Sequence, residues 1–132
     1  MKTKALKFLV LTIVLFVTPF TLSAKTVSYL FKGKIANTDV RVVLNINTDN
    51  YQVNGSYYYY NAQGKKQSQE IKLNGHCNPV DPTHNYFFIS ESFDGNYCGG
   101  WETNFNTRTK RMVGTITNSK GKKYDIDLQK VE

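Results

Sequence analysis

Hydrophobic and polar residues alternate one by one along almost the whole chain after residue 25. The clearest example is the stretch 40–46, where valine, leucine and isoleucine occupy every even position. A period of two places every second side chain on the same face of an extended chain, and it is typical of a β-strand with one buried face. No stretch after residue 25 has the 3.6-residue period of an amphipathic helix. The pattern therefore predicts an all-β domain.

Short groups of Asn, Asp and Gly interrupt the alternating stretches. These residues tolerate positive φ and close local hydrogen bonds, so they suit tight hairpin turns. They divide the chain into eight expected strands, at about 27–35, 39–47, 51–60, 67–75, 86–93, 97–105, 111–118 and 123–130. Nearly all the connections are short, which makes consecutive strands antiparallel neighbours.

A meander of this kind has two exposed edges unless it closes, and closure removes both. We therefore expect an eight-stranded antiparallel up-and-down barrel, with a two-sheet sandwich as the alternative. The one long connection is expected at 76–85, because Pro79 and Pro82 cannot donate the backbone hydrogen bonds of an inner strand. This segment could cover one mouth of the barrel.

Residues 1–24 have the three-part layout of a secretory signal peptide. Lysines precede the apolar run 8–17, and small or polar residues then lead to Ala24. The run is too short for a bilayer core, which needs roughly 20 residues, so a retained membrane anchor is the less favoured alternative. Cleavage after Ala24 or Ser23 would leave 25–132 as a single domain, in the periplasm or secreted, with no membrane span.

Charge and aromatic content change this picture in two ways. The 132 residues carry a net charge of +7, and removal of Lys2, Lys4 and Lys7 with the signal peptide lowers it to +4. The remaining basic residues gather in hairpin turns at opposite ends of the expected barrel, so we expect no nucleic-acid partner. An aromatic fraction of 14% argues against a disordered chain.

Short glycine and aromatic motifs recur in a fixed order along the domain. They are Phe31-x-Gly33-x-Ile35, Val53-x-Gly55-x-Tyr57-x-Tyr59, Ile71-x-Leu73-x-Gly75, Ile89-x-Glu91, Gly99-Gly100-Trp101 and Gly114-x-Ile116. This order resembles a class of small exported bacterial meander β-barrel domains, most of them of uncharacterised function, and more loosely the barrels of avidins and lipocalins. The resemblance covers nearly all of 27–130 and implies a barrel and export. No residue of an avidin biotin site is carried over.

Cys77 and Cys98 are the two cysteines of the chain. Cysteines of exported proteins usually pair, so we expect a Cys77–Cys98 disulfide. The expected strands conflict with this pairing, because they place the two residues at opposite ends of the barrel, roughly 23 Å apart. A disulfide needs Cα atoms within about 7 Å. A folded-back loop 76–85, a different strand position, intermolecular pairing or free thiols would each resolve the conflict.

The run of four tyrosines from Tyr57 to Tyr60 is the most unusual local feature. Alternation from Val53 turns Tyr57 and Tyr59 into the barrel and Tyr58 and Tyr60 outward. The inner pair either packs in the core, which is the commoner role, or lines a ligand pocket. The outer pair could form a contact surface for a partner.

Glu91 is a candidate ligand-binding residue. Its orientation is left open, because the strand 86–93 could adopt either of two registers. In one register Glu91 faces inward with Phe87 and Ile89, and its buried carboxylate then needs hydrogen-bond partners. It would act there as a structural hydrogen-bond hub or as part of a polar ligand site. The opposite register turns Phe88 inward and leaves Glu91 in water.

Trp101 is the last candidate for ligand binding. It should face inward, where it is a core plug or, less often, a platform for a ligand. Gly99 and Gly100 directly before it indicate a β-bulge or a close approach of another strand.

A metal centre and an enzymatic site find little support. His76, Asp81 and His84 share the segment 76–85, but their spacing matches no defined zinc motif, so we interpret them as surface residues. The chain has no recognised catalytic or phosphate-binding motif, and we expect neither catalysis nor a cofactor.

The combined features predict a non-catalytic binding module with an unknown target. The first hypothesis is a small ligand held in the barrel mouth by Tyr57, Tyr59, Glu91 and Trp101. The alternative is a protein-interaction module, such as an inhibitor or an envelope accessory protein, that uses Tyr58 and Tyr60. The expected partner is accordingly an unknown small ligand or an envelope protein.

Overall fold

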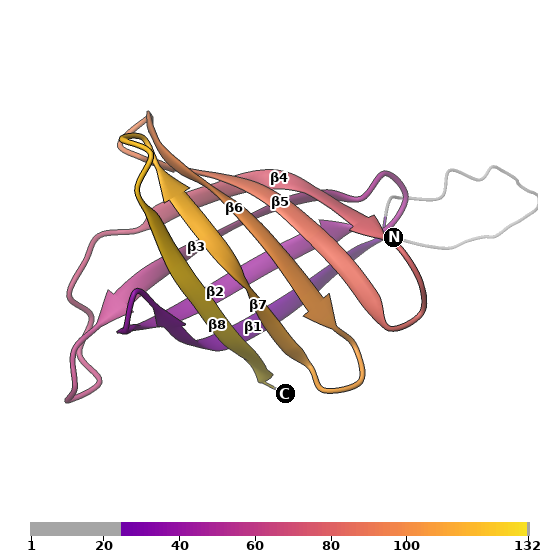
Figure 1. The fold of residues 1–132 in the computed structure, drawn as a ribbon, viewed down its shortest axis with the longest axis horizontal. Helices are drawn as coiled ribbons and strands as arrows, with labels where there is room; N and C mark the ends of the chain where they lie inside the picture. Colours follow the sequence, from indigo (N-terminus) through magenta and orange to yellow (C-terminus); the bar gives the residue numbers. More distant parts are fainter. Residues whose placement is uncertain (1–24, 132) are drawn as a thin grey trace, which may run out of the picture.

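The computed structural model describes residues 25–131, which form a closed eight-stranded antiparallel barrel (Figure 1). The strands are β1 (Thr26–Ile35), β2 (Thr38–Asn47), β3 (Gln52–Tyr60), β4 (Ile71–Pro79), β5 (His84–Phe93), β6 (Asn96–Asn106), β7 (Arg111–Asn118) and β8 (Lys123–Val131). Each strand pairs with the next one, and β8 returns to pair with β1. The expected up-and-down barrel is confirmed.

The segment 1–24, where the sequence predicts a signal peptide, lies outside the described residues. Within 25–131 no helix is long and apolar enough to cross a membrane.

The barrel has two ends that differ in their connections. The N-terminal end, to the right in Figure 1, carries the turns 48–51, 80–83 and 107–110. The opposite end carries 36–37, 61–70, 94–95 and 119–122. The two shortest turns, 36–37 and 94–95, have positive φ at both residues, as a two-residue hairpin of type I′ requires.

Side chains at alternate positions of all eight strands fill the lumen. The largest fully buried ones are Trp101, Tyr57, Phe31 and Phe87, and aliphatic residues such as Leu44 occupy the space between them. This arrangement follows the sequence pattern directly, because successive side chains of a strand point to opposite faces. A barrel of eight strands is just wide enough to be filled by its own side chains.

The expected position of the fourth strand is wrong by four residues. β4 begins at Ile71 and ends at Pro79, whereas the sequence indicated 67–75. The alternation continues past Leu73 through two small residues, Gly75 and Cys77, which weakens the hydrophobic signal. Pro79 is tolerated because the last residue of a strand need not donate its backbone N–H to the sheet.

The long connection therefore lies elsewhere. The segment 61–70 joins β3 to β4, and the expected long loop 76–85 shrinks to the turn 80–83, because β5 begins already at His84. The segment 61–70 folds back onto β3, where the Ser68 hydroxyl accepts a hydrogen bond from the Tyr59 amide.

The expected Cys77–Cys98 disulfide is also wrong, because both thiols are free. Cys77 is in register with Phe87, and Phe87 with Thr103, so Cys98 lies five residues farther along β6. At about 3.3 Å per residue this separation is roughly 16 Å. It exceeds the Cα separation of about 7 Å that a disulfide can bridge.

Candidate functional site

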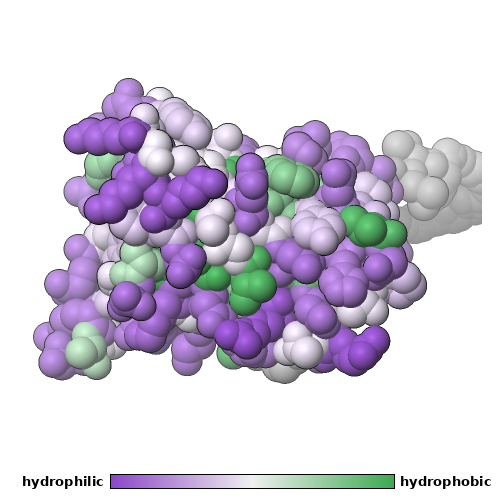
Figure 2. All heavy atoms as spheres, in the orientation of Figure 1, coloured by the Kyte–Doolittle hydropathy of each residue, from purple (hydrophilic) through white to green (hydrophobic). Residues whose placement is uncertain are grey.

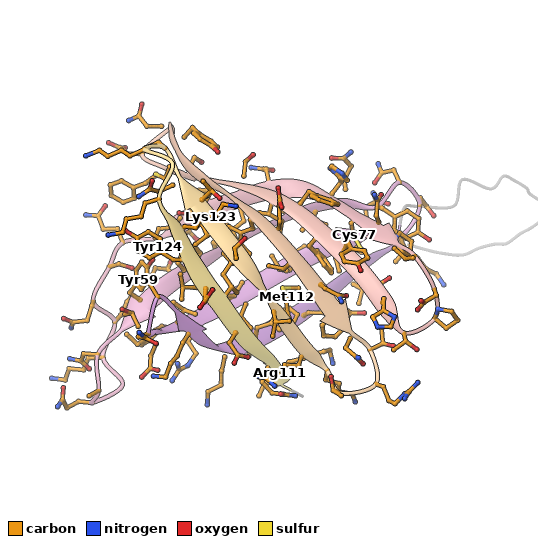
Figure 3. The ribbon with its side chains drawn as sticks, in the orientation of Figure 1. Tyr59, Cys77, Arg111, Met112, Lys123 and Tyr124 are labelled. Carbon is orange, nitrogen blue, oxygen red and sulfur yellow. The ribbon has the colours of Figure 1, made fainter. Side chains whose placement is uncertain are left out.

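The four candidate ligand-binding residues come together inside the barrel. Tyr57 and Tyr59 project from β3, Glu91 from β5 and Trp101 from β6. They lie in the half of the lumen nearer the end of the barrel that carries the segment 61–70. Figure 3 shows Tyr59 at that end, beside Tyr124 and far from Cys77. We call Tyr57, Tyr59, Glu91 and Trp101 the Glu91 cluster.

The Glu91 carboxylate is the centre of this cluster. The Tyr57 hydroxyl donates to Glu91 Oε1 over 2.7 Å, and the Trp101 indole N–H donates to the same oxygen over 3.0 Å. The Tyr59 hydroxyl lies 3.4 Å from the Tyr57 hydroxyl. The ring of Tyr57 packs against Trp101, with centroids 5.6 Å apart, and edge-on against Tyr59. The exposed fractions are 0% for Tyr57, 1% for Trp101 and 7% for Glu91.

The inward orientation of Glu91 settles the register that the sequence left open. Phe87, Ile89 and Glu91 all face the lumen, and Phe88 faces outward. Glu91 lies opposite Gly99 on β6, and the register shifts between Glu91 and Ser92, which agrees with the expected bulge. A Cβ at Gly99 would lie 2.7 Å from the carbonyl oxygen of Thr117, so glycine at this position allows β6 and β7 to approach closely.

Burial also controls the acidity of the two tyrosines. Removal of water raises the pKa of the Tyr57 hydroxyl far above its ordinary value of 10.0, and the neighbouring Glu91 carboxylate adds to the effect. Burial raises the pKa of the Tyr59 hydroxyl as well, although its hydrogen bond with Tyr57 works in the other direction. Both hydroxyls therefore keep their protons and act as hydrogen-bond donors.

The Glu91 cluster connects three strands across the lumen. Two neutral donors satisfy one carboxylate oxygen, and no lysine or arginine among the described residues pairs with Glu91. Hydrogen bonds to a charged acceptor stabilise a fold more than bonds between neutral groups. The arrangement is that of a hydrogen-bond hub whose aromatic rings occupy the surrounding space.

Substitutions of Glu91 should separate the hydrogen bonds from the charge. Glu91→Ala leaves the Tyr57 hydroxyl and the Trp101 N–H without an acceptor, and each unpaired buried group costs about 1–3 kcal/mol. Glu91→Gln keeps an acceptor oxygen, so we expect it to retain about 2 kcal/mol more of the free energy of unfolding than Glu91→Ala. Urea unfolding, followed by the fluorescence of Trp101, measures both values. Equal losses in the two variants would contradict the hub.

The raised pKa of Tyr57 makes stability depend on pH in alkaline solution. A group whose pKa is higher in the folded than in the unfolded state stabilises the fold below the unfolded value, here about 10, and loses this contribution as the pH rises further. We expect the free energy of unfolding to fall above pH 10, by about 1.4 kcal/mol per pH unit for one such group. Tyr57→Phe should flatten this slope in urea titrations between pH 8 and 11, and the outer-face control Tyr58→Phe should not.

A small pocket opens at the N-terminal end, where the sequence suggested no site. It has a volume of about 120 Å³ and is lined by Val27, Tyr29, Ile46, Thr48, Tyr51, Cys77, Asn85 and Phe87. Burial raises the pKa of the Cys77 thiol to about 11, so this thiol remains protonated and unreactive at neutral pH. The pocket is mainly apolar and lies at the other end of the barrel from the Glu91 cluster.

The three residues considered for a metal lie apart. His76 belongs to β4 and stacks on Phe88, with ring centroids 5.4 Å apart. The Nδ1 atom of His84 lies 3.1 Å from the Asp81 carboxylate across the turn 80–83, and the backbone amides of Thr83 and His84 lower the pKa of the Asp81 carboxyl. Among residues 25–131, no three His, Cys, Asp or Glu side chains are placed to hold a metal ion together.

The outward tyrosines Tyr58 and Tyr60 contact cations of the chain itself. The Lys66 ammonium lies 3.9 Å from the ring centroid of Tyr58, and the Arg41 guanidinium lies 4.7 Å from that of Tyr60. Cation–π contacts of this kind occupy the ring faces. Both tyrosines are half-buried, and their availability to a partner is reduced.

Another aromatic surface lies on the outer side of β4–β7, and the sequence reading missed it. Tyr86, Phe88 and Val113 are 40%, 38% and 42% exposed, and His76 and Tyr97 lie beside them. Two hollows, of about 530 and 410 Å³, meet at Phe88 and Glu102. We call this region the outer aromatic face. The apolar run Phe87-Phe88-Ile89 was the sequence feature that indicated this face. A strand that is apolar on both sides favours contacts on its outer side as well as in the core.

Figure 2 shows how hydrophobic residues are distributed on the side of the barrel turned to the viewer. They form small groups between hydrophilic residues, with one group in the middle of that side.

A scan against protein-family models and a search of curated proteins give no match for this chain.

Proposed function

We propose that this protein is an exported, non-catalytic binding module that recognises another polypeptide through its outer aromatic face. The observation that carries the proposal is the exposure of Tyr86 and Phe88 on neighbouring positions of a rigid sheet. Single exposed apolar residues are common on any protein. Aromatic residues that share a surface with hollows are typical of binding sites, because rings supply contact area at low entropic cost.

The interior is a poorer binding site than the outer aromatic face. The rings and the carboxylate of the Glu91 cluster lie against one another, so a ligand there would have to displace them. The hollows on the outer aromatic face, by contrast, have volumes in the range of about 300–1,000 Å³ that bound groups commonly fill. We therefore keep the hypothesis of a protein-interaction module, but place its binding surface at Tyr86 and Phe88 and not at Tyr58 and Tyr60.

Site-specific cross-linking tests this function in cells that make the protein. A photoreactive phenylalanine analogue replaces Phe88, and the control carries it at Lys32, which is exposed on the outer side of β1. We expect one polypeptide to cross-link at position 88 and not at position 32. The purified polypeptide should then bind the wild type and lose its affinity for a Tyr86→Ser/Phe88→Ser variant. The same cross-links at both positions would refute the proposal.

The pocket at the N-terminal end supports a second candidate, a small apolar ligand. A pocket of about 120 Å³ is below the size of common ligand sites, about 300–1,000 Å³, and close to a cavity of about 150 Å³ that holds benzene. It would accept one small apolar group, such as the end of an acyl chain. Native mass spectrometry of protein purified from its own cells should then show an added mass that Cys77→Leu removes by filling the pocket. An identical mass in both samples would reject this candidate.

A further inference from the structure

Gly100 differs from the other glycines inside the strands. At Gly33, Gly55, Gly75, Gly99 and Gly114, an added Cβ would lie within 1.9–2.7 Å of a backbone oxygen of a neighbouring strand. At Gly100 the nearest atoms would be the Tyr97 hydroxyl at 3.4 Å and the Ile89 carbonyl at 3.8 Å, which is ordinary contact. Gly100 also has no positive φ. Neither backbone packing nor conformation requires glycine there, and its effect is to leave a hollow in the outer surface.

Aromatic rings and a carboxylate surround this hollow. Gly100 lies at the floor of the 530 Å³ hollow, with Phe88, Tyr97 and Glu102 among its walls. Phe88 is directly opposite Glu102 in the pairing of β5 with β6. Glu102 and Gly100 are alternate residues of β6, so their side-chain positions are about 7 Å apart on the same face. The bulge in β6 turns Tyr97 to the same side, where its hydroxyl reaches over Gly100.

Glu102 is an exposed carboxylate without a partner in the described part of the chain. Two other acidic side chains on the outer side of the strands have a cation of their own, in the pairs Asp39–Lys34 and Asp127–Arg111. Asp125 on β8 is exposed and lies in neither of these pairs, but it does not line the hollow beside Glu102. No described lysine or arginine pairs with Glu102, although the domain as a whole is basic. A negative charge next to ring faces attracts a cation twice, through ion pairing and through cation–π contact.

We propose that the hollow over Gly100 receives an arginine side chain of the partner polypeptide. Its guanidinium pairs with Glu102 and stacks on the ring of Phe88 or Tyr97. Arginine fits better than lysine, because a planar guanidinium both stacks on rings and binds a carboxylate through two parallel hydrogen bonds. This inference rests on the proposed function and names the group that the outer aromatic face recognises.

Two short peptides test the inference with the purified protein. The probe is Ac-Ala-Leu-Arg-Leu-Ala-NH₂, and the matched control has citrulline, a neutral isostere, in place of arginine. Backbone amide shifts of Gly100 and Glu102 in ¹H–¹⁵N spectra report binding. We expect the arginine peptide to bind at least fivefold more tightly than the citrulline peptide, and added salt should reduce this difference because it screens charges.

Three variants locate the effect. Glu102→Gln should lower the affinity for the arginine peptide to that for the citrulline peptide. Asp125→Asn, which makes the same charge change on β8, should leave the affinity for the arginine peptide unchanged. Gly100→Val should abolish binding of both peptides by filling the hollow, with a melting temperature no lower than that of the wild type.

Two results would overturn the inference in distinguishable ways. If both peptides shift the amide signals of the outer aromatic face and bind with equal affinity, the arginine site is refuted and the proposed function is retained. If neither peptide shifts these amides, or if Glu102→Gln leaves the arginine peptide unaffected, the arginine site falls, and cross-linking at position 88 decides the proposed function separately.

Discussion

A Gly55→Val variant is expected to be unable to form the barrel. A Cβ atom at position 55 would lie 1.9 Å from the carbonyl oxygen of Val43 and 3.0 Å from its carbonyl carbon, both on the backbone of β2. These atoms belong to the β2–β3 ladder and cannot move without breaking its hydrogen bonds. Glycine at this position allows the two strands to approach closely, as a small and strongly curved barrel demands.

Circular dichroism and size-exclusion chromatography of the purified variant measure this effect. The expected result is loss of the folded species, because the collision involves backbone and the core around it is filled. Gly100→Val is the matched control, since a Cβ atom at position 100 would meet only ordinary contacts, and we expect this variant to remain folded. A Gly55→Val variant that melts within a few degrees of the wild type would contradict the close approach of β2 and β3.

Trp101→Ala should have the second largest effect. The indole is almost fully buried, packs against Tyr57 and donates its N–H to Glu91. Replacement of a buried tryptophan by alanine typically costs about 3–5 kcal/mol, since it removes apolar contacts and leaves a cavity. A domain of this size has about 5–15 kcal/mol in total, so the variant should lose a large part of its stability.

Urea unfolding followed by circular dichroism gives the value for Trp101→Ala, since the variant lacks the only tryptophan of the chain. Trp101→Phe keeps a ring but no N–H donor and should lose less. Phe93→Ala, at an exposed position after β5 leaves the core, should change stability by less than about 1 kcal/mol. A loss at Trp101 no greater than that at Phe93 would show that the indole does not support the core.

The fold could be predicted from the sequence because one face of nearly every strand is strictly apolar. Alternation over 40–46 and the turns rich in Asn, Asp and Gly determine strand number and order, and closure follows from the cost of open edges. The error at β4 has the same origin. Gly75 and Cys77 continue the inward series with small side chains, so the apolar signal fades before the strand ends.

The convergence of the Glu91 cluster was only partly predictable. Inward positions for Tyr57, Tyr59 and Trp101 follow from alternation, and the structure has all three on the inner side. The side occupied by Glu91 depends on the pairing of β5, where Phe87 and Phe88 are both apolar and either register satisfies the pattern. The register is that of the pairing of β5 with β4 and β6, and two donors from β3 and β6 satisfy the carboxylate that this register buries.

The outer aromatic face could not be found from local patterns. It is formed by residues of the four consecutive strands β4–β7, and their pairing register places His76, Phe88 and Glu102 in one row. The absence of a partner for Glu102 among the described residues is likewise a property of the assembled surface. An exposed phenylalanine next to a buried one was the single sequence signal, and it fits a buried strand equally well.

The most direct test of a binding surface outside the barrel compares affinities for the polypeptide that cross-links at position 88. Three forms of the protein are titrated with it by calorimetry: the wild type, Tyr86→Ser/Phe88→Ser on the outer aromatic face, and Glu91→Gln in the lumen. We predict that the outer-face variant binds at least tenfold more weakly and that Glu91→Gln binds as the wild type does. Unchanged affinity in the outer-face variant together with weakened binding in Glu91→Gln would contradict the proposal and place the binding site in the lumen.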